Sequence, residues 1–289
     1  MTQGQIRALL VCPICRGQLC FTDLKAICRR CGQDYPVRGE VPVLIAPDSP
    51  FHSPPPPRTA RGEGRILPPS VRRLLISYVN FNPPLTIWLD RSLFRHLNQC
   101  TPGLRILNLG SGVGLFDHIL APHLQPINLD VQTQGRVDVL ADAHALPFPD
   151  ESLDGIFSNA VLEHVQRPWR VAEEIHRVLR PGGKVFINVP FLNVIHDTHD
   201  YFRFTDRGLD ILFSRFRKID GGVSGGPSSF LAPFLVEYLL YFVPGQYLKG
   251  LVQPLLRLFV WPLKYLDLAI RRNPNLRIAA DAFYFVGEK

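Results

Sequence analysis

The sequence predicts an α/β fold with a doubly wound, largely parallel sheet and a small cysteine-rich unit in front of it. Short apolar runs with strand spacing alternate with helical patterns from residue 104 to residue 289, which is the pattern of a parallel sheet covered by helices. A glycine-rich turn follows the first run, and two CxxC motifs lie within the first 31 residues. The 289 residues, 46% hydrophobic and 20% charged, suffice for one large globular domain and a small one.

Seven strands and the helices between them follow from the apolar patterns. The strands are expected at residues 104–110, 127–131, 137–142, 153–159, 184–190, 217–223 and 282–289. Helical spacing covers residues 112–124, 167–183 and 206–216, and the second of these helices is expected to stop at Pro181-Gly182-Gly183. Two further helices are expected between residues 71 and 98, interrupted near Pro83 and Pro84.

Composition divides the chain into three parts. The cysteine motifs define a unit over residues 1–46, and residues 47–69 form a linker rich in Pro, Gly, Ser and Arg. Residues 70–289 then form the α/β domain, into which residues 227–276 are inserted between the last two strands.

The insertion at residues 227–276 is strongly apolar and aromatic. Charges and prolines interrupt it before about 18 apolar residues accumulate, which disfavours a transmembrane helix and favours two or three amphipathic helices. Two interpretations remain open: the helices bury their apolar faces as a lid, or they contact a membrane surface. The basic residues that would assist a membrane contact are Lys249, Arg257, Lys264, Arg271 and Arg272.

The chain is basic, with a net charge of +7 and a pI of about 9.3. This balance is compatible with nucleic acid, an anionic membrane surface or an acidic substrate, and equally with an ordinary surface. The first residues carry no apolar run followed by a cleavage site, so no secretory signal is expected. Cysteines in CxxC pairs are typical of a reducing compartment. We therefore expect a cytoplasmic protein, peripheral to the inner face of the membrane if the insertion contacts lipid.

The motifs CPIC (12–15) and CRRC (28–31) place four cysteines in two matching turns. Two such turns make a closed tetrahedral set of thiolates, which suits structural Zn²⁺ and leaves no open position for catalysis; an iron site is the alternative. The expected ligands are Cys12, Cys15, Cys28 and Cys31. A unit this small draws much of its folding free energy from the metal. Cys20 and Cys100 lack paired spacing and are expected to be buried thiols.

The segment CPICRGQL…CRRCGQDYPVRGEVPVLI resembles the zinc-ribbon family whose members activate tRNA methyltransferases. The resemblance covers about the first 45 residues. It implies a scaffold or a docking module for a protein partner, and no reaction of its own.

The turn Gly110-Ser111-Gly112-Val113-Gly114 lies where the first strand of the α/β domain gives way to a helix. Glycines let a ligand approach the backbone, and the helix N-terminus favours a negative group. A dinucleotide fingerprint requires Gly or Ala five residues after its first glycine, but Leu115 and Asp117 stand there in the two registers. The turn instead suits S-adenosylmethionine, which presents an amino-acid carboxylate to it.

Acids follow the next two strands. Asp130 ends the second strand and can accept both hydroxyls of a ribose. Asp142, with the backbone of Ala143, ends the third strand at the expected place of an adenine edge. Either aspartate alone could be a helix cap or a solvated loop residue. Together with the turn, they converge on the crevice where open sheets bind ligands.

Three motifs, RILNLGSGVG, ADAHALPFPDESLDGIFSNAVLEHV and RVLRPGGKVFINVP, resemble the class I S-adenosylmethionine-dependent methyltransferase family, especially its small-molecule branch. The resemblance spans about residues 70–289 and implies a Rossmann-like seven-stranded sheet of order 3-2-1-4-5-7-6, with the last strand antiparallel. It also implies cofactor contacts by Gly110, Gly112, Asp130, Asp142 and Asn159. The family has an acid where this chain has Asn108, and an amide cannot balance the ammonium group of the cofactor.

The loops after the fourth and fifth strands carry the candidates for handling the acceptor. His164 follows the fourth strand and is expected to touch the cofactor. The loop after the fifth strand supplies three candidate general bases, which assist when the acceptor is a hydroxyl, namely His196, His199 and Asp200. Tyr201 and Arg203 are candidates for lining the pocket and holding an anion. A local hydrogen-bonded turn is the alternative for His199 and Asp200.

Three functions remain open at this point. The apolar insertion favours methylation of a small-molecule, lipid-linked or glycan acceptor. Charge and ribbon also permit an RNA methyltransferase, and Asn108 permits a non-catalytic scaffold. Some acceptors are disfavoured: no N-P-P-[FY] motif follows the fourth strand, Cys100 is misplaced for covalent catalysis at cytosine C5, and no metal-ligand cluster lies near the acceptor loops.

Overall fold

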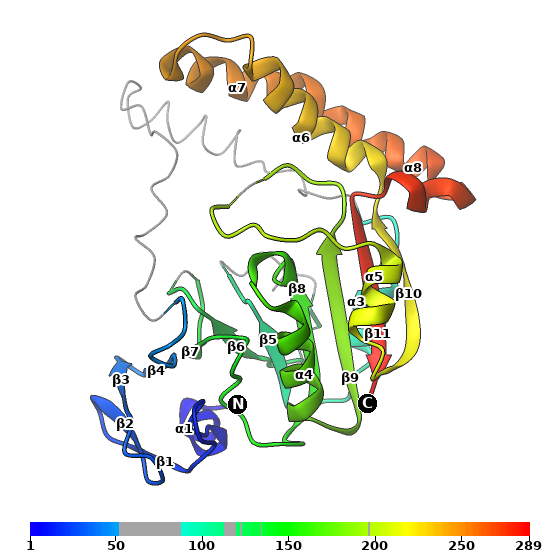
Figure 1. Ribbon diagram of the computed structural model, residues 1–289. Coiled ribbons are helices and arrows are strands. Elements are labelled where there is room, and N and C mark those ends of the chain that lie inside the picture. Colours follow the sequence, from blue (N-terminus) through cyan, green and yellow to red (C-terminus); the bar gives the residue numbers. More distant parts are fainter. Residues whose placement is uncertain (52–87, 113–119, 122, 134, 196) are drawn as a thin grey trace.

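The computed structural model describes residues 1–51, 88–112, 120–121, 123–133, 135–195 and 197–289 (Figure 1). The strands are β1 (Leu19–Phe21), β2 (Lys25–Cys28), β3 (Asp34–Arg38), β4 (Val41–Leu44), β5 (Ile106–Leu109), β6 (Ile127–Asp130), β7 (Val139–Ala141), β8 (Leu153–Asn159), β9 (Leu179–Pro190), β10 (Arg217–Gly225) and β11 (Ala282–Glu288). Within the described residues they form one mixed sheet, in the order β1-β2-β3-β4-β7-β6-β5-β8-β9-β11-β10.

The seven strands from β5 onwards confirm the predicted Rossmann-like sheet. Numbered along the chain from β5, the order β7-β6-β5-β8-β9-β11-β10 is 3-2-1-4-5-7-6. The strands β5 to β9 pair in parallel, and β11 runs antiparallel to both β9 and β10. The carboxyl ends of the parallel strands therefore meet at one edge of the sheet, where open sheets bind ligands.

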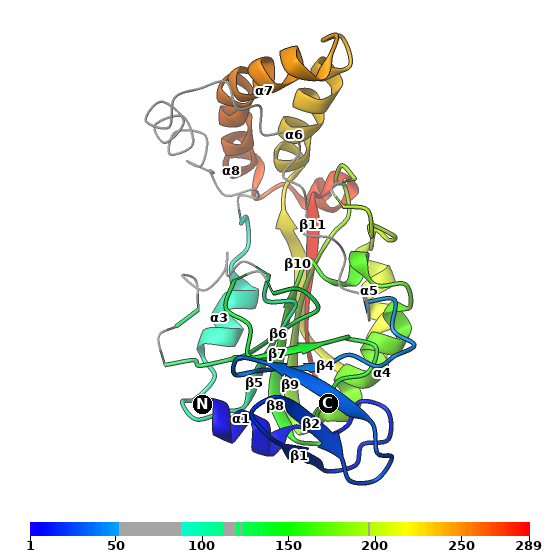
Figure 2. The same ribbon diagram turned by 90° about the vertical axis from the view of Figure 1, so that its left-hand side faces the viewer.

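Helices cover both faces of this sheet (Figure 2). The helix α3 (Ser92–Asn98) lies on one face, and α4 (Pro168–Val178) and α5 (Asp206–Leu212) lie on the other. Because successive side chains of a strand point to opposite faces, Ile106 packs in the cluster that contains α3, whereas Leu107 packs in the cluster that contains α4. Strands buried on both faces need continuous apolar runs, and this is why the sequence shows them.

The helix predicted at residues 167–183 ends earlier than expected. The helix α4 ends at Val178, and Leu179 already begins β9. Pro181 and Gly182, whose φ is +77°, lie in a bulge where the pairing of β9 with β8 changes register. The helix predicted at residues 112–124 lies largely outside the described residues. Of the two helices predicted between residues 71 and 98, the second is α3 and the first lies outside them.

The cysteine-rich unit is joined to the sheet. The helix α1 (Gln3–Leu9) begins with a capping box of Thr2 and Gln5, and β1 to β4 form an antiparallel ribbon. The last strand, β4, then pairs in parallel with β7, through Val43 with Leu140. The unit therefore extends the edge of the α/β sheet (Figure 1). The domain boundary predicted at residue 46 stays a prediction.

Residues 227–279, here called the helical arm, connect β10 to β11. The arm contains α6 (Pro227–Leu240), α7 (Gln246–Val260), η2 (Trp261–Tyr265), α8 (Leu266–Ile270) and η3 (Pro274–Ala279). It lies beyond the carboxyl edge of the parallel strands, at the end of the molecule opposite to the two termini (Figures 1 and 2). No helix in the described part of the chain is long and apolar enough to cross a bilayer.

The buried carboxylate of Asp267 fixes the fold of the helical arm. This residue of α8 accepts hydrogen bonds from the amides of Ser228 and Ser229 in the first turn of α6, at 2.8 and 2.9 Å. A carboxylate at a helix N-terminus satisfies free amides and complements the helix dipole. A Cβ on Gly226 would lie 2.5 Å from this carboxyl group, so the contact also needs glycine before α6. The helix α8 is thus held against the first turn of α6.

Candidate active site and metal centre

The glycine turn leaves the carboxyl end of β5. Gly110 has a φ of +73°, and a Cβ on it would lie 2.2 Å from Cγ2 of Val161. The amides of Gly110 and Ser111 both donate to the carbonyl of Leu129 in β6. Only glycine therefore fits at position 110, because a side chain would meet both an unfavourable backbone conformation and a neighbouring valine.

Ser111 provides an unsatisfied polar atom in this turn. Its side chain is buried, and its hydroxyl has no hydrogen-bond partner within the described residues. Buried hydroxyls are normally paired, so this one is available to a polar ligand. Beside it, Gly112 has open space where a Cβ would stand. Gly114, the last glycine of the motif, lies outside the described residues.

Asp130 and Asp142 lie at the ends of neighbouring strands, and each already has partners. Asp130 accepts a hydrogen bond of 2.7 Å from the amide of Gly112 and so fixes the glycine turn. Asp142 accepts hydrogen bonds of 2.6 Å from the hydroxyl of Ser49 and from Nδ1 of His144. Burial opposes ionisation of Asp142, but these hydrogen bonds outweigh it and hold its pKa below the ordinary value. Asp142 is therefore a carboxylate held in one orientation.

Two asparagines near the carboxyl ends of the strands also form hydrogen bonds to neighbouring side chains. Asn108 is buried in β5, and its amide nitrogen donates to Asn128 of the neighbouring β6. Asn159, at the end of β8, accepts a hydrogen bond of 2.9 Å from Asn188 of β9. Directly after Asn159, Ala160 has a φ of +55°, which non-glycine residues rarely adopt. Such strain is concentrated at functional sites, and here it lies where β8 gives way to the loop that follows it.

Asp200 and Arg203 form an ion pair in the loop after β9. Both carboxylate oxygens of Asp200 accept from the guanidinium of Arg203, and the side chain of Asp200 is buried. Two parallel bonds of this kind fix the relative orientation of the groups, and they raise the pKa of Arg203. Arg203 also donates to the carbonyl of Val194. The pair therefore shapes the loop, and the predicted roles of the two residues as base and anion binder stay predictions.

His164 and His199 bring the two acceptor loops together. The carbonyl of His199 accepts a hydrogen bond of 2.7 Å from Nδ1 of His164. The ring of His199 lies 6.2 Å from the ring of Tyr201, and its side chain is 36% exposed. His199 is thus accessible to a ligand at this edge, whereas His196 lies outside the described residues.

Glu163 is a buried acid that the sequence analysis did not single out. Its side chain is 0% exposed, and neither carboxyl oxygen has a hydrogen-bond partner in the described part of the chain. Oε1 lies 3.8 Å from Nε2 of His164. Burial raises the pKa of Glu163 to about 8, although nearby Arg203 acts in the opposite direction. A glutamate within the short apolar stretch from Val161 to Val165, a few residues after a strand, is the sequence signal that could have indicated it.

The first residues of the predicted linker fold back over the sheet. Ser49 holds Asp142, as described above, and Phe51 is buried with its ring 5.8 Å from the ring of His199. Residues 47–51 therefore connect the cysteine-rich unit to Asp142 and His199. No spacing or motif in this Pro-rich stretch could have indicated these contacts. The remainder of the predicted linker lies outside the described residues.

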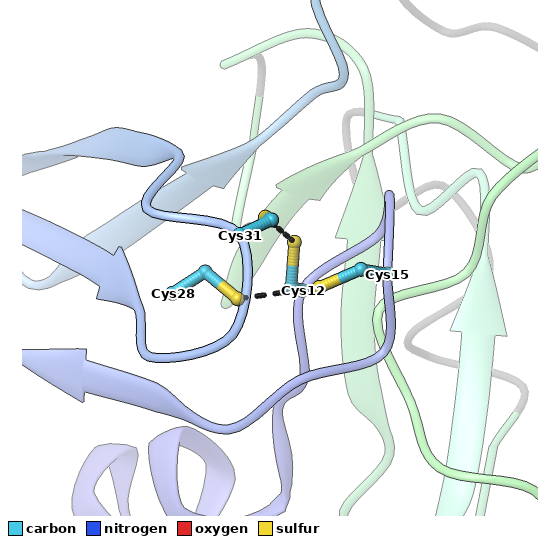
Figure 3. A group of neighbouring side chains, drawn as sticks. All are labelled: Cys12, Cys15, Cys28 and Cys31. Atoms are coloured by element: carbon cyan, nitrogen blue, oxygen red, sulfur yellow. Dashed lines mark hydrogen bonds between the residues drawn. The ribbon is translucent and has the colours of Figure 1, made fainter.

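The four predicted cysteine ligands form one cluster (Figure 3). Their sulfur atoms all lie within 4.8 Å of one another, with Cys12 and Cys31 3.8 Å apart and Cys15 and Cys28 3.4 Å apart. Zinc–sulfur bonds of about 2.3 Å place the sulfurs of a tetrahedron about 3.8 Å apart, so the cluster has the dimensions of a four-thiolate site. Cys20 and Cys100 lie apart from it and are half-buried, less buried than predicted.

Both cysteine turns have the same local geometry. Residue 16 follows the first pair and donates its amide to the carbonyl of Cys12, and Gly32 donates in the same way to Cys28. Both residues have a positive φ, +58° for Arg16 and +73° for Gly32. The equivalent turns explain why two CxxC motifs direct their sulfurs to one point. Tyr35 adds a hydrogen bond of 3.2 Å between its hydroxyl and Sγ of Cys12.

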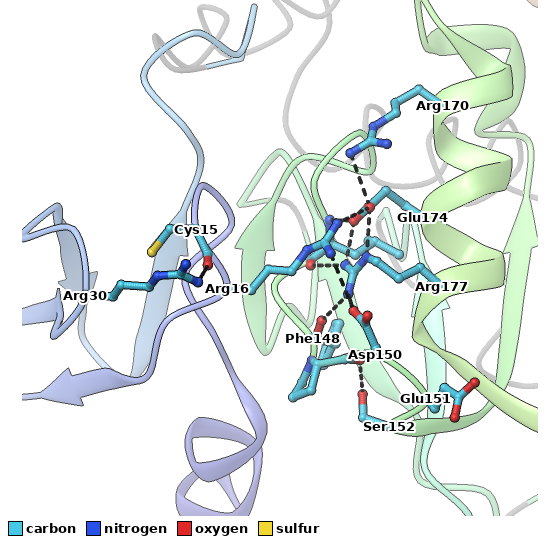
Figure 4. Close-up of polar contacts among 12 residues, drawn as sticks. Cys15, Arg16, Arg30, Phe148, Asp150, Glu151, Ser152, Arg170, Glu174 and Arg177 are labelled. Carbon is cyan, nitrogen blue, oxygen red and sulfur yellow. Dashed lines mark hydrogen bonds and ion pairs between the residues drawn. The ribbon is translucent and has the colours of Figure 1, made fainter.

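An ion network ties the cysteine-rich unit to α4 (Figure 4). Glu174 of α4 is buried, accepts hydrogen bonds from Arg177, and also accepts from the amide of Leu146. Arg16, in the first cysteine turn, reaches the same carboxylate at 3.7 Å. Because a buried carboxylate is stable only with such partners, the network fixes the position of the unit on the domain.

Comparison with known proteins identifies the central part of the chain. Residues 107–187 match the protein family described as a methyltransferase domain. This segment is a methyltransferase domain. The matched residues include the glycine turn, Asp130, Asp142, Asn159 and the acceptor loop with His164.

Two curated relatives share this methyltransferase domain. A malonyl-[acyl-carrier protein] O-methyltransferase from Methylococcus capsulatus is 37% identical over 107 residues, which are 32% of this chain and 38% of that protein. The biotin biosynthesis bifunctional protein BioHC from Cellvibrio japonicus is 37% identical over 97 residues, 29% of this chain and 19% of that protein. The chain thus spans less than two fifths of the length of either relative.

A solved structure, that of the [4+2]-cyclase SpnF, is similar to 75% of this chain and 93% of its own, at 18% identity and a TM-score of 0.49.

Proposed function

We propose that the protein is an S-adenosylmethionine-dependent methyltransferase that acts on a small-molecule, lipid-linked or glycan acceptor. The observation that carries this proposal is the methyltransferase domain with its glycine turn, unsatisfied Ser111 hydroxyl and fixed acids at one sheet edge. When bound, S-adenosylmethionine supplies an activated methyl group, so the chain's residues mainly have to bind and align the reactants.

The residues proposed to hold the cofactor surround the carboxyl ends of β5 to β8. The turn Gly110-Ser111-Gly112 and the neighbouring Gly114 would meet its amino-acid part, and Asp130 its ribose hydroxyls. Asp142 and the backbone of Ala143 would meet the adenine. Further contacts are proposed for Asn108, Asn159 and His164. The conformation of Gly110 and the unpaired Ser111 hydroxyl support a ligand at this place, because a ligand would use both.

The residues proposed to handle the acceptor lie in the loops after β8 and β9. His199, whose side chain is exposed, is a candidate for the base that removes a proton from a hydroxyl acceptor. His196, outside the described residues, is proposed as a second candidate for the same role. Asp200 and Arg203 hold the backbone of the second loop, and Tyr201 would line the pocket. In the in-line displacement, these groups orient the acceptor oxygen and take its proton.

The helical arm favours an apolar acceptor. Phe191 and Leu192, which begin the loop after β9, donate backbone hydrogen bonds to Asp281 and Ala280, directly after the arm. Arg277 of η3 forms an ion pair with Asp206 at the start of α5. The acceptor loop therefore adjoins an element rich in exposed apolar side chains, which an acceptor with a lipid or other apolar portion would contact.

We also propose that the four-cysteine cluster binds structural Zn²⁺. The sulfur–sulfur distances support this assignment, and four thiolate ligands leave no position for a substrate. The faces of the unit that do not contact the domain are proposed to be available to a protein partner.

Two experiments test the proposed activity. Isothermal titration with S-adenosylmethionine should show binding, and no binding at millimolar cofactor would refute the enzyme and favour a scaffold. Incubation with a labelled methyl donor and separated lipid, glycan, small-molecule, protein and RNA fractions should place label in one of the first three. Label in RNA alone would refute the proposed acceptor class.

Substitution of Gly110 tests the cofactor site directly. Gly110→Ala is expected to weaken binding of S-adenosylmethionine by about tenfold or more, because the new Cβ would displace Val161 and the turn. Gly103→Ala is the matched control, since Gly103 has a φ of +86° but open space around its Cβ. The control should share the backbone strain and keep the affinity. Equal affinities for wild type and Gly110→Ala would contradict the site.

A further inference from the structure

The helical arm exposes an unusual amount of apolar surface. Its exposed large apolar side chains are Leu231, Phe234, Tyr238, Leu239, Tyr241, Phe242, Tyr247, Leu248, Leu251, Leu255, Leu258, Phe259, Tyr265, Leu266, Leu268, Ile270 and Ile278. The rest of the described chain contributes far fewer. Within α7 no residue is buried at all. Exposed apolar residues are normally scattered singly over a protein surface. Their concentration on one element therefore marks an interaction site.

The apolar residues of α7 lie on one face of the helix. Leu248, Leu251, Leu255 and Leu258 follow the spacing of three and four residues that places side chains on one side, and Tyr247 and Phe259 flank them. The half-buried Val252, Leu256 and Val260 lie toward another side, and α7 packs against α6. One side of α7 therefore packs against α6, and the stripe of leucines on the other side is exposed.

Positive charge accompanies this apolar surface. Among the arm's exposed or half-buried charged residues the cations are Lys249, Arg257, Arg271, Arg272 and Arg277, and the anion is Glu237. The other acid, Asp267, is buried and caps α6. Arg277 is paired with Asp206 of α5, so the arm's excess of positive charge comes from the other four cations. A surface complementary to this arm would therefore combine apolar groups with negative charge.

Aromatic side chains with polar tips add a third feature. The rings of Phe234 and Tyr238 in α6 and of Phe242, two residues past its end, form successive contacts, with centroids 6.2 and 5.4 Å apart. Trp261 and Tyr265 form a further pair at 5.5 Å. Tyrosine and tryptophan favour the boundary between lipid headgroups and acyl chains, where the ring contacts apolar groups and the polar end of the side chain contacts water.

We propose that the helical arm binds the surface of an anionic lipid bilayer and lies in its interface, with the outward face of α7 inserted among the headgroups. An amphipathic helix with exposed leucine and phenylalanine on one face and cations on its polar side is the element that binds in this way. The length and hydropathy of the described helices do not allow a bilayer span, which agrees with an interfacial position. This inference does not depend on methyl transfer, because lipid binding is measured without any substrate.

Vesicle co-sedimentation with the full chain tests the proposal. The protein should bind vesicles that contain a quarter phosphatidylglycerol in phosphatidylcholine, and it should bind pure phosphatidylcholine vesicles at least about tenfold more weakly, because several cations contribute. The triple variant Leu251→Ser, Leu255→Ser, Phe259→Ser should lose at least about tenfold in affinity for the anionic vesicles, because apolar area no longer leaves water on binding.

The control is Ile211→Ser on α5. Ile211 is 76% exposed, close to the 77% of Phe259, but lies outside the arm. The Ile211→Ser variant should bind vesicles as wild type does. Retained zinc and far-UV circular dichroism show that the triple variant is folded. Equal binding by the triple variant, or no binding of wild type to anionic vesicles, would overturn the proposal. A dimer that dissociates only in the triple variant would also overturn it, since the arm would then be covered by a second copy.

Discussion

Cys31→Ser is expected to abolish stoichiometric zinc binding and to lower the free energy of unfolding by several kcal/mol. Structural zinc sites contribute apparent binding free energies of about 10–16 kcal/mol, and a unit of this size has little core to replace them. Cys31 is the exposed member of the cluster, so its replacement removes a thiolate with little change in packing. Metal analysis and denaturant unfolding at pH 7.5 measure the two effects.

The loss of zinc should also weaken the binding of S-adenosylmethionine. The ribbon's last strand pairs with β7, and residues 47–51 lead from it to the hydrogen bond between Ser49 and Asp142. A disordered ribbon would release Asp142 from one of its partners, and weaker binding of S-adenosylmethionine should follow. Calorimetric titration of the zinc-free variant measures this effect.

Cys20→Ser is the matched control for Cys31→Ser. Cys20 lies in the same ribbon but outside the cluster, with its sulfur near Nε of Arg29. It should keep one zinc per chain and a nearly unchanged free energy of unfolding. If Cys31→Ser kept full zinc and wild-type stability, the cluster would not be a structural metal site.

Glu163→Gln is expected to make the protein more stable than wild type at pH 8.5, but not at pH 5. The pKa of Glu163 rises from 4.5 in the unfolded chain to about 8 in the folded protein because its carboxyl group is buried. This difference corresponds to at most about 5 kcal/mol of unfolding free energy. Glutamine imitates the neutral form of the side chain and does not titrate.

The sign of the effect follows from proton binding. Below pH 4.5 both states hold the proton of Glu163, and the full stability is present. Between pH 4.5 and about 8 the unfolded chain releases this proton while the folded protein keeps it, so the free energy of unfolding falls as pH rises. Above about pH 8 the folded protein also ionises, and this contribution falls no further.

Urea unfolding at pH 5, 7 and 8.5 measures the difference between Glu163→Gln and wild type, in which the titration of other groups cancels. Glu173→Gln is the control, because Glu173 is half exposed on α4 and pairs with Arg170 at the surface. Its difference from wild type should stay small at every pH. A pH-independent difference for Glu163→Gln would show that Glu163 is ionised in the folded protein throughout this range.

Local patterns in the sequence determined the α/β sheet and the four-cysteine cluster. Strands such as β5 and β8 are largely buried on both faces, so their apolar runs are visible without knowledge of any neighbour. The two cysteine turns are equally local, since four residues suffice to direct two sulfurs to one point. The position of the glycine turn and of Asp130 followed for the same reason, because each lies directly at the end of a strand that could be recognised.

The contacts between these local units were decided only by the tertiary structure. Nothing in the sequence around Val43 indicates that β4 pairs with β7, because backbone hydrogen bonds between distant strands leave no residue pattern. The same holds for Ser49 and Phe51, which contact residues more than ninety positions away along the chain. The pKa of Glu163 depends on the burial of its side chain, and burial is a property of the packed molecule. The sequence by itself therefore determined the elements and their chemistry, and the tertiary structure decided which groups meet, because long-range packing depends on the shape of the whole chain.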